Sequence, residues 1–240
     1  MLFRSLTSLE GAPQVVENNF NCSHNSLTSL EGAPQVVKGD FNCSHNKLTS
    51  LEGAPQEVGE GFDCSDNKLT SLEGAPQEVK GYFFCSHNKL TSLEGAPQEV
   101  GRDFYCYNNS LTSLEGAPQV VGGGFFCSNN SLTSLEGAPK VVKGNFYCSD
   151  NKLTSLEGAP QVCGQLACFW CYDNPISGKT LSLVFKTMQE KKIDYWMALS
   201  LLKSEISTHD FKKLEGELEK RISKDAQKGI SMLNRFKVFK

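Results

Sequence analysis

Residues 6–13 read Leu6-Thr7-Ser8-Leu9-Glu10-Gly11-Ala12-Pro13, and this octapeptide returns seven times, each copy 21 residues after the one before it. The eight copies begin at Leu6, Leu27, Leu48, Leu69, Leu90, Leu111, Leu132 and Leu153. A fixed period of this size is typical of a solenoid, in which each repeat buries its apolar face only against neighbouring repeats. The repeat therefore decides the fold of residues 1–175.

Within one unit, Phe20 and Cys22 alternate with polar residues, which predicts a short, half-buried strand. The return path then directs apolar side chains inward at Leu27, Leu30 and Ala33. Positions 32 and 34 supply bends, because glycine reaches positive φ and proline fixes its own φ. This arm is too short and too interrupted for a full helix, so we expect turns or a second short strand around residues 35–37.

The pattern resembles the leucine-rich-repeat family, whose core reads LxxLxLxxNxL. Phe20 and Cys22 take two leucine positions, and Asn25, Leu27 and Leu30 follow at the family spacing. The resemblance covers about residues 1–176, and its short period is most similar to bacterial and bacteriophage versions of the family. It implies a β-rich solenoid with a parallel β-sheet on the concave face. The chain departs from eukaryotic members in lacking a helix-length convex arm and a disulfide-capped flank.

An asparagine and a cysteine also recur in each repeat and form two columns along the solenoid. Asparagine returns at positions 25, 46, 67, 88, 109, 130, 151 and 174. A buried amide costs a few kcal/mol unless it is hydrogen-bonded, so we expect each to bond to the backbone of its own and adjacent coils. Cysteine returns at positions 22, 43, 64, 85, 106, 127, 148 and 171, the last one two residues late. Disulfide geometry does not suit a continuous ladder, so reduced thiols in an intracellular protein are expected.

The outward position between the inward Phe and Cys turns from polar to aromatic along the chain. It holds Asn21, Asn42, Asp63, Phe84, Tyr105, Phe126, Tyr147 and Trp170. Flanking outward positions add Tyr82, Asp103, Tyr107 and Tyr172. With the coils in register, the C-terminal half of the sheet exposes a contiguous aromatic stripe of the kind that marks interaction sites. The alternatives are that the rings only stabilise the sheet, or that the C-terminal region folds back over them.

Two groups of residues invite metal chemistry. His24, His45 and His87 share a position just past the strand, but Asp and Asn fill it elsewhere, which favours a tight turn. Cys163 and Cys168 stand with the column cysteine in a Cys-x4-Cys-x2-Cys pattern that lacks a fourth zinc ligand. We therefore favour an irregular last coil with two spare thiols and expect no metal site.

The repeat stops after residue 175, where the charge also changes sign. Residues 1–175 carry 10 Lys/Arg against 19 Asp/Glu, whereas residues 176–240 carry 14 against 8. Helical apolar spacing after Ser177, Asp194 and Thr208, and over residues 224–235, predicts a small all-α domain that caps the last coil. Its basic patch is Lys212, Lys213, Lys220, Arg221, Lys224, Lys228, Arg235 and Lys237. Interspersed glutamates favour a solvated helical face over a nucleic-acid site.

The sequence carries no recognisable catalytic motif. Some bacterial leucine-rich-repeat effectors attach a helical ubiquitin-ligase domain with a catalytic cysteine, but residues 176–240 contain no cysteine. No Gly-rich phosphate loop and no HExxH motif occurs. We expect a protein-binding module that is not an enzyme and uses no cofactor. The resemblance implies a phage or bacterial intracellular inhibitor or adaptor.

Two other functions stay open at this point. A nucleotide or other small ligand would stack on Trp170 and Tyr172 near the domain junction. Alternatively, the first coil leaves an uncapped sheet edge around Leu2, Phe3 and Leu6, where copies of the chain would assemble end to end. The chain has no 18-residue apolar run and no apolar signal core at its start, so we expect a cytoplasmic location, in the host cell if phage-encoded.

Overall fold

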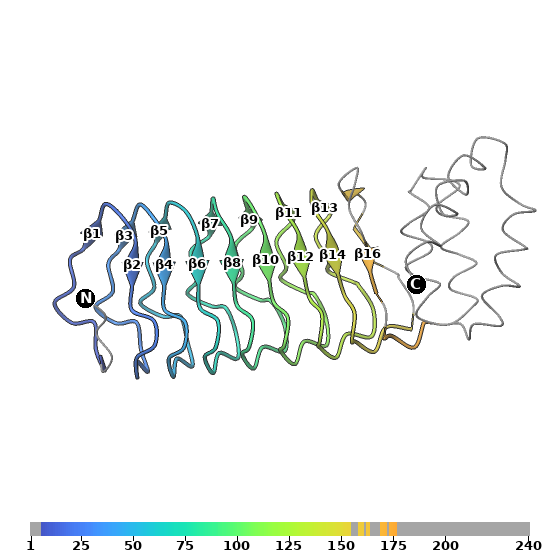
Figure 1. The fold of residues 1–240 in the computed structure, drawn as a ribbon, viewed down its shortest axis with the longest axis horizontal. Coiled ribbons are helices and arrows are strands. Elements are labelled where there is room, and N and C mark those ends of the chain that lie inside the picture. The colour runs from blue at the N-terminus through green and yellow to red at the C-terminus, as the bar shows by residue number, and fades with distance from the viewer. Residues whose placement is uncertain (1–5, 155–157, 161, 164–168, 172, 177–240) are drawn as a thin grey trace, which may run out of the picture.

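The computed structural model describes residues 6–154, 158–160, 162–163, 169–171 and 173–176. Over these residues the chain winds into a solenoid with two parallel β-sheets along its length (Figure 1). The helical domain expected over residues 176–240 and its basic patch lie outside the described residues, apart from Ile176. Among the described residues, no helix is long and apolar enough to cross a membrane.

Each coil contributes one two-residue strand to each sheet. Sheet A contains β1 (Val15–Val16), β3 (Val36–Val37), β5 (Glu57–Val58), β7 (Glu78–Val79), β9 (Glu99–Val100), β11 (Val120–Val121), β13 (Val141–Val142) and β15 (Val162–Cys163). Sheet B contains β2 (Phe20–Asn21), β4 (Phe41–Asn42), β6 (Phe62–Asp63), β8 (Phe83–Phe84), β10 (Phe104–Tyr105), β12 (Phe125–Phe126), β14 (Phe146–Tyr147) and β16 (Phe169–Trp170). Sheet B contains the strand predicted at Phe20, and sheet A contains the second strand expected around residues 35–37.

The strands pair in parallel with the register that the period imposes. Phe41 lies opposite Phe62, and the same 21-residue offset holds from coil to coil. At the last step Val142 still pairs with Cys163, but Phe146 pairs with Phe169. Two extra residues therefore enter the chain between β15 and β16, which explains why the last column cysteine comes two residues late.

The core consists of columns of identical side chains, one from each coil. Rings of the inward phenylalanines stack with centroids 5.3–5.7 Å apart from Phe20 to Phe146. Leu27, Leu30 and Ala33 are buried as predicted, and so are their equivalents in the middle coils, from Leu48 to Ala117. Because every coil meets only similar coils, the core grows by addition of equal layers rather than around one centre.

The asparagine column ties each turn to its neighbours. Asn46 Nδ2 donates to the carbonyl oxygens of Cys22 and Cys43 at 3.0 Å, and Asn46 Oδ1 accepts from the Leu27 backbone N–H at 3.0 Å. Equivalent bonds recur from Asn67 through Asn151. The prediction that these amides bond to the backbone of two coils is confirmed.

The chain reverses at two places in each coil. Gly32 has φ +84°, and a Cβ there would lie 2.9 Å from backbone atoms of Leu9 and Glu10, so only glycine fits. The second reversal places the predicted turn position in the left-handed region, with φ +54° at His24 and similar values down the column. Asn, Asp and His are the non-glycine residues enriched there, which confirms the expected turn role.

Candidate functional site

The outward positions of sheet B form the candidate site. From β4 to β14 a buried Phe precedes the outward residue of each strand and a buried Cys follows it, so the outward side chains stand on one face. This face carries Asn21, Asn42 and Asp63 over its first three strands. It carries the aromatic ladder over the last five strands: Phe84, Tyr105, Phe126, Tyr147 and Trp170.

Neighbouring rings of the aromatic ladder stack face to face. Centroid distances are 4.3 Å for Phe84–Tyr105, 4.4 Å for Tyr105–Phe126, 4.7 Å for Phe126–Tyr147 and 5.9 Å for Tyr147–Trp170, with interplanar angles of 15° or less. Phe84 to Tyr147 are half-buried, and Trp170 keeps 36% of its surface exposed. The inner rings therefore cover one another's faces and leave their edges outward.

Polar residues at the same position have a local structural role that the aromatic residues lack. Asn42 Oδ1 accepts hydrogen bonds from the backbone N–H and the hydroxyl of Ser44, at 3.0 and 2.8 Å. Asp63 does the same for Ser65. Where Phe84 and Tyr147 replace this acceptor, two buried serine hydroxyls have no hydrogen-bond partner: those of Ser86 and Ser149.

Tyr82 extends the ladder at its first ring. Its ring lies 5.0 Å from that of Phe84 at an angle of 58°, and it fills the space above Gly61, where a Cβ would come within 2.3 Å of the ring. Burial raises the pKa of the Tyr82 hydroxyl, and the charge of Asp40 and a hydrogen bond to it act in the same direction. Asp40 Oδ1 also accepts from the Gly61 backbone N–H at 2.8 Å.

A second aspartate, Asp103, accepts a hydrogen bond from a ring at the centre of the ladder. The Tyr105 hydroxyl donates to Asp103 Oδ2 at 3.0 Å, while Asp103 Oδ1 accepts from the Gly124 backbone N–H. Burial, together with the bond to Asp103, raises the pKa of Tyr105 to about 12. Tyr105 is therefore a neutral hydrogen-bond donor at physiological pH.

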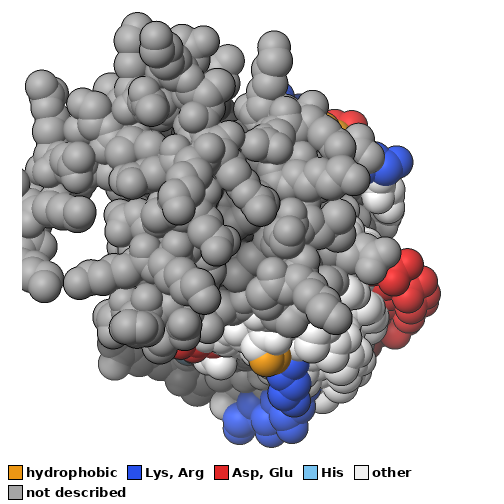
Figure 2. All heavy atoms as spheres, turned by 90° about the vertical axis from the view of Figure 1, so that its right-hand side faces the viewer, with side chains coloured by type: hydrophobic (Ala, Val, Ile, Leu, Met, Phe, Trp, Pro, Cys, Tyr) orange, Lys and Arg blue, Asp and Glu red, His pale blue; other side chains and the backbone are white. Residues whose placement is uncertain are grey.

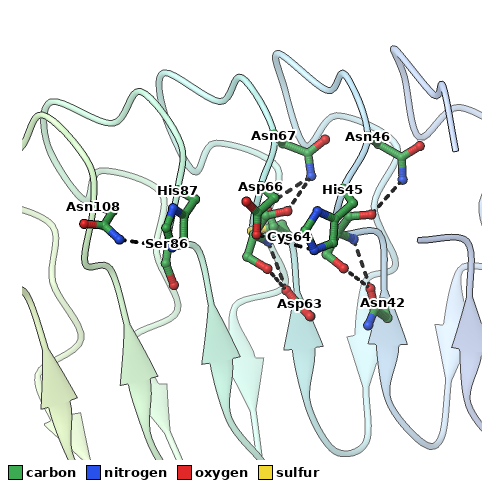
Figure 3. A network of polar contacts seen from close by, with 12 residues as sticks. Asn42, His45, Asn46, Asp63, Cys64, Asp66, Asn67, Ser86, His87 and Asn108 are labelled. Atoms are coloured by element: carbon green, nitrogen blue, oxygen red, sulfur yellow. Dashed lines mark hydrogen bonds and ion pairs between the residues drawn. The ribbon is translucent and has the colours of Figure 1, made fainter. Parts of the chain in front are cut away.

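The turn column runs beside the ladder as a polar strip, part of which Figure 3 shows. His24 and His45 stack at 4.2 Å, and His45 Nε2 lies 3.6 Å from Asp66 Oδ2. His87 Nε2 lies 3.0 Å from Asn108 Nδ2. The strip meets the aromatic side chains at His87, whose ring contacts the edge of the Tyr107 ring at 5.3 Å.

The structure brings together most of the predicted site. Tyr82, Asp103 and Tyr107 all contact members of the ladder or one another. Tyr172 and Cys168 lie outside the described residues, as does the side chain of Cys163. The sequence analysis did not single out Asp40 or the unpartnered serines, and it assigned His87 only to a turn. A glycine at position 61, directly below a tyrosine in its column, was the available signal for the Tyr82 arrangement.

The column cysteines are buried and form no disulfide bonds. Burial raises the pKa of the Cys22 thiol to about 12, and it raises the pKa of Cys43, Cys64 and Cys106 well above the ordinary value. These thiols are protonated at physiological pH, so they are poor nucleophiles and poor metal ligands. Within the described ranges, no three His, Cys, Asp or Glu side chains are placed to hold a metal ion.

Comparison with known proteins supports the fold. No protein-family model and no curated protein sequence matches the chain. A solved structure of YopM from Yersinia enterocolitica WA-314 is similar, with a TM-score of 0.53 and 22% sequence identity over 69% of this chain. The chain spans 39% of the length of that protein. YopM is a leucine-rich-repeat protein, and the likeness together with the 21-residue solenoid shows a leucine-rich-repeat fold.

Proposed function

We propose that the chain is a protein-binding repeat module that engages a partner protein through the outer face of sheet B. The observation that carries this proposal is the aromatic ladder, a half-exposed apolar strip across five coils. Large contiguous apolar strips on a protein surface mark interaction sites, and Tyr and Trp are enriched among the residues that dominate binding energy. Leucine-rich-repeat folds are commonly protein-binding modules.

Stacking stabilises the ladder, but the residues of the ladder also leave two serine hydroxyls without a partner. A stacked aromatic pair contributes about 0.5–1.5 kcal/mol beyond its buried area. A buried hydroxyl without a partner costs about 1–3 kcal/mol, and two such hydroxyls, of Ser86 and Ser149, lie beside ladder residues. An asparagine at these positions would supply the missing acceptor, as Asn42 does for Ser44. Gain and cost are of the same order, so stacking gives the rings no clear advantage over asparagine, and we attribute them to binding.

The stacking geometry favours a protein over a nucleotide. A base or sugar binds an aromatic side chain through the ring face. Both faces of Tyr105 and Phe126 are covered by neighbouring rings, and one face of Trp170 lies against Tyr147. Ring edges arranged in a row instead fit the extended apolar contact that a protein surface offers.

We also propose that the chain has no catalytic activity and acts inside a cell, as an inhibitor or adaptor of phage or bacterial type. Buried, protonated cysteines fit a reducing compartment, where thiols stay free. The phage or bacterial origin rests only on the similarity of the short repeat to such proteins. End-to-end assembly through the edge strands β1 and β2 is the competing structural role.

Binding through the ladder is tested by a pull-down with a variant that carries Phe84→Asn, Tyr105→Asn, Phe126→Asn and Tyr147→Asn. Asparagine occupies the same position in β2 and β4, so the variant keeps a side chain that this strand accepts. We expect the partner recovered with the natural chain to be lost. The melting temperature should change little, because the restored serine hydrogen bonds offset the lost stacking.

A matched control replaces four threonines of the same four coils: Thr91→Ala, Thr112→Ala, Thr133→Ala and Thr154→Ala. These side chains are exposed and lie outside the strands of both sheets. The control should retain the partner. Retention of every partner by the ladder variant would refute binding through this face.

A further inference from the structure

The outer face of sheet B carries aspartate on five of its eight coils. Three positions of each coil border this face: the residue before the buried Phe, the outward strand residue and the turn residue in the left-handed conformation. They include Asp40, Asp63, Asp66, Asp103, Asp150 and Asp173. No described residue at these positions is Lys or Arg. Such a face repels an acidic partner and attracts a basic one.

The negative charge is densest where the ladder begins. Asp40, Asp63 and Glu60 all raise the pKa of the Tyr82 hydroxyl by their charge, so three carboxylates surround this group. Asp66 follows Asp63 by three residues in the same coil. Tyr82 packs on Phe84, the first ring of the ladder. Acidic and apolar surfaces are therefore continuous here.

The described lysines and arginines lie outside these three positions. Lys38 pairs with Glu17 at 2.7 Å, and both are exposed. Exposed lysines follow the asparagine column at Lys47, Lys68, Lys89 and Lys152, and exposed glutamates recur in every octapeptide that the structure describes in full. Seen along the solenoid, basic and acidic side chains gather in separate strips (Figure 2).

We propose that this face binds a cationic, aliphatic segment of the partner protein. Basic side chains of the segment lie over Asp40, Asp63 and Asp66, and its aliphatic side chains contact the ring edges of the aromatic ladder. This inference rests on the proposed protein-binding function and adds the chemistry and direction of the partner. Charge complementarity fixes the order, because the two neighbouring coils that carry Asp40, Asp63 and Asp66 precede the aromatic ones along the solenoid.

The geometry sets the length of the segment. The five strands of the ladder span four intervals of about 4.8 Å, or about 19 Å. An extended chain covers this distance with about six residues. The acidic coils that carry Asp40 and Asp63 add about 10 Å, which is about three more residues. The partner segment is therefore about nine residues long when extended.

Two fluorescein-labelled peptides test the charge of the partner. Both contain six residues of alternating Leu and Ser, preceded by three Lys in one peptide and three Glu in the other. Fluorescence anisotropy with the full chain should show the Lys peptide binding at least about tenfold more tightly than the Glu peptide. The difference should shrink at 1 M salt, because exposed ion pairs are screened.

The variant that locates the cationic site carries Asp40→Asn, Asp63→Asn and Asp66→Asn. Asparagine occupies equivalent positions in other coils, at Asn19, Asn42 and Asn108, so the fold tolerates the changes. Affinity for the Lys peptide should fall about tenfold. The matched control, Glu31→Gln, Glu52→Gln and Glu73→Gln, removes the same charge from exposed residues elsewhere and should bind within twofold of the natural chain.

The outcomes separate this inference from the proposed function. Equal binding of both peptides, equal loss in the Asp and Glu variants, or no binding of the Lys peptide overturns the cationic partner. If the ladder variant also loses the partner in the pull-down, the protein-binding function stands without the charge inference. If that variant keeps the partner, the function itself fails.

Discussion

At the scale of single residues, the turn column shows how one backbone angle selects a side chain. Every described member of the column has φ between +52° and +57°. The column contains only His, Asp and Asn. These side chains tolerate the left-handed region because they hydrogen-bond locally, whereas a β-branched side chain clashes there. The variation that suggested metal or acid–base chemistry in the sequence thus follows from the backbone.

We predict that Asp150→Val destabilises the solenoid by about 1–2 kcal/mol, whereas Asp150→Asn changes its stability little. Asp150 has φ +54° and is exposed, so the valine variant loses little packing and reports backbone strain. Urea unfolding followed by circular dichroism measures the difference. Equal midpoints for the two variants would show that the turn column is not selected by its backbone conformation.

At the scale of the strands, the value of a core side chain depends on its place in the stack. The Phe104 ring lies between those of Phe83 and Phe125, at 5.3 Å from each, and is fully buried. The Phe20 ring belongs to the edge strand β2, is partly exposed and, among the described residues, stacks only on Phe41. The same residue type in the same column therefore has two environments.

We predict that Phe104→Ala costs about 3–5 kcal/mol, because it leaves a cavity between two intact coils. Phe20→Ala should cost less than half as much, since the edge coil already exposes part of the ring to water. Urea midpoints of the two variants, measured side by side, test this ratio. A similar cost at both positions would mean that the first coil is as well covered as the middle ones.

The strands also show what the sequence allows one to predict. The 21-residue period predicts every strand pairing up to β15, and the late Cys171 indicates the two-residue insertion before β16. The interaction of Tyr82 with Asp40 was not predictable, because it joins residues two coils apart and depends on one rotamer above Gly61. Nor does periodicity show whether rings present faces or edges. Column membership follows from the repeat, but side-chain conformation does not.

At the scale of the whole molecule, the cysteine column links stability to pH. Six described thiols, from Cys22 to Cys127, have a pKa raised above the ordinary value of 9.0, with burial as the largest cause. The unfolded chain loses protons from these thiols above pH 9, whereas the folded chain keeps them. The stability that these buried thiols contribute is therefore fully present below pH 9, and it is lost as the pH rises toward 12 and beyond.

We predict that the free energy of unfolding falls steeply between pH 9 and pH 10, by about 1.4 kcal/mol per pH unit for each thiol that ionises only in the unfolded chain. Urea midpoints between pH 7.5 and pH 10 under reducing conditions measure the slope. Cys85→Ala removes one such thiol, so its deficit relative to the natural chain at pH 7.5 should shrink by about 1.4 kcal/mol at pH 10. A deficit that stays constant would mean that the thiol ionises equally well in the folded coil, and that the cysteine column is accessible to water.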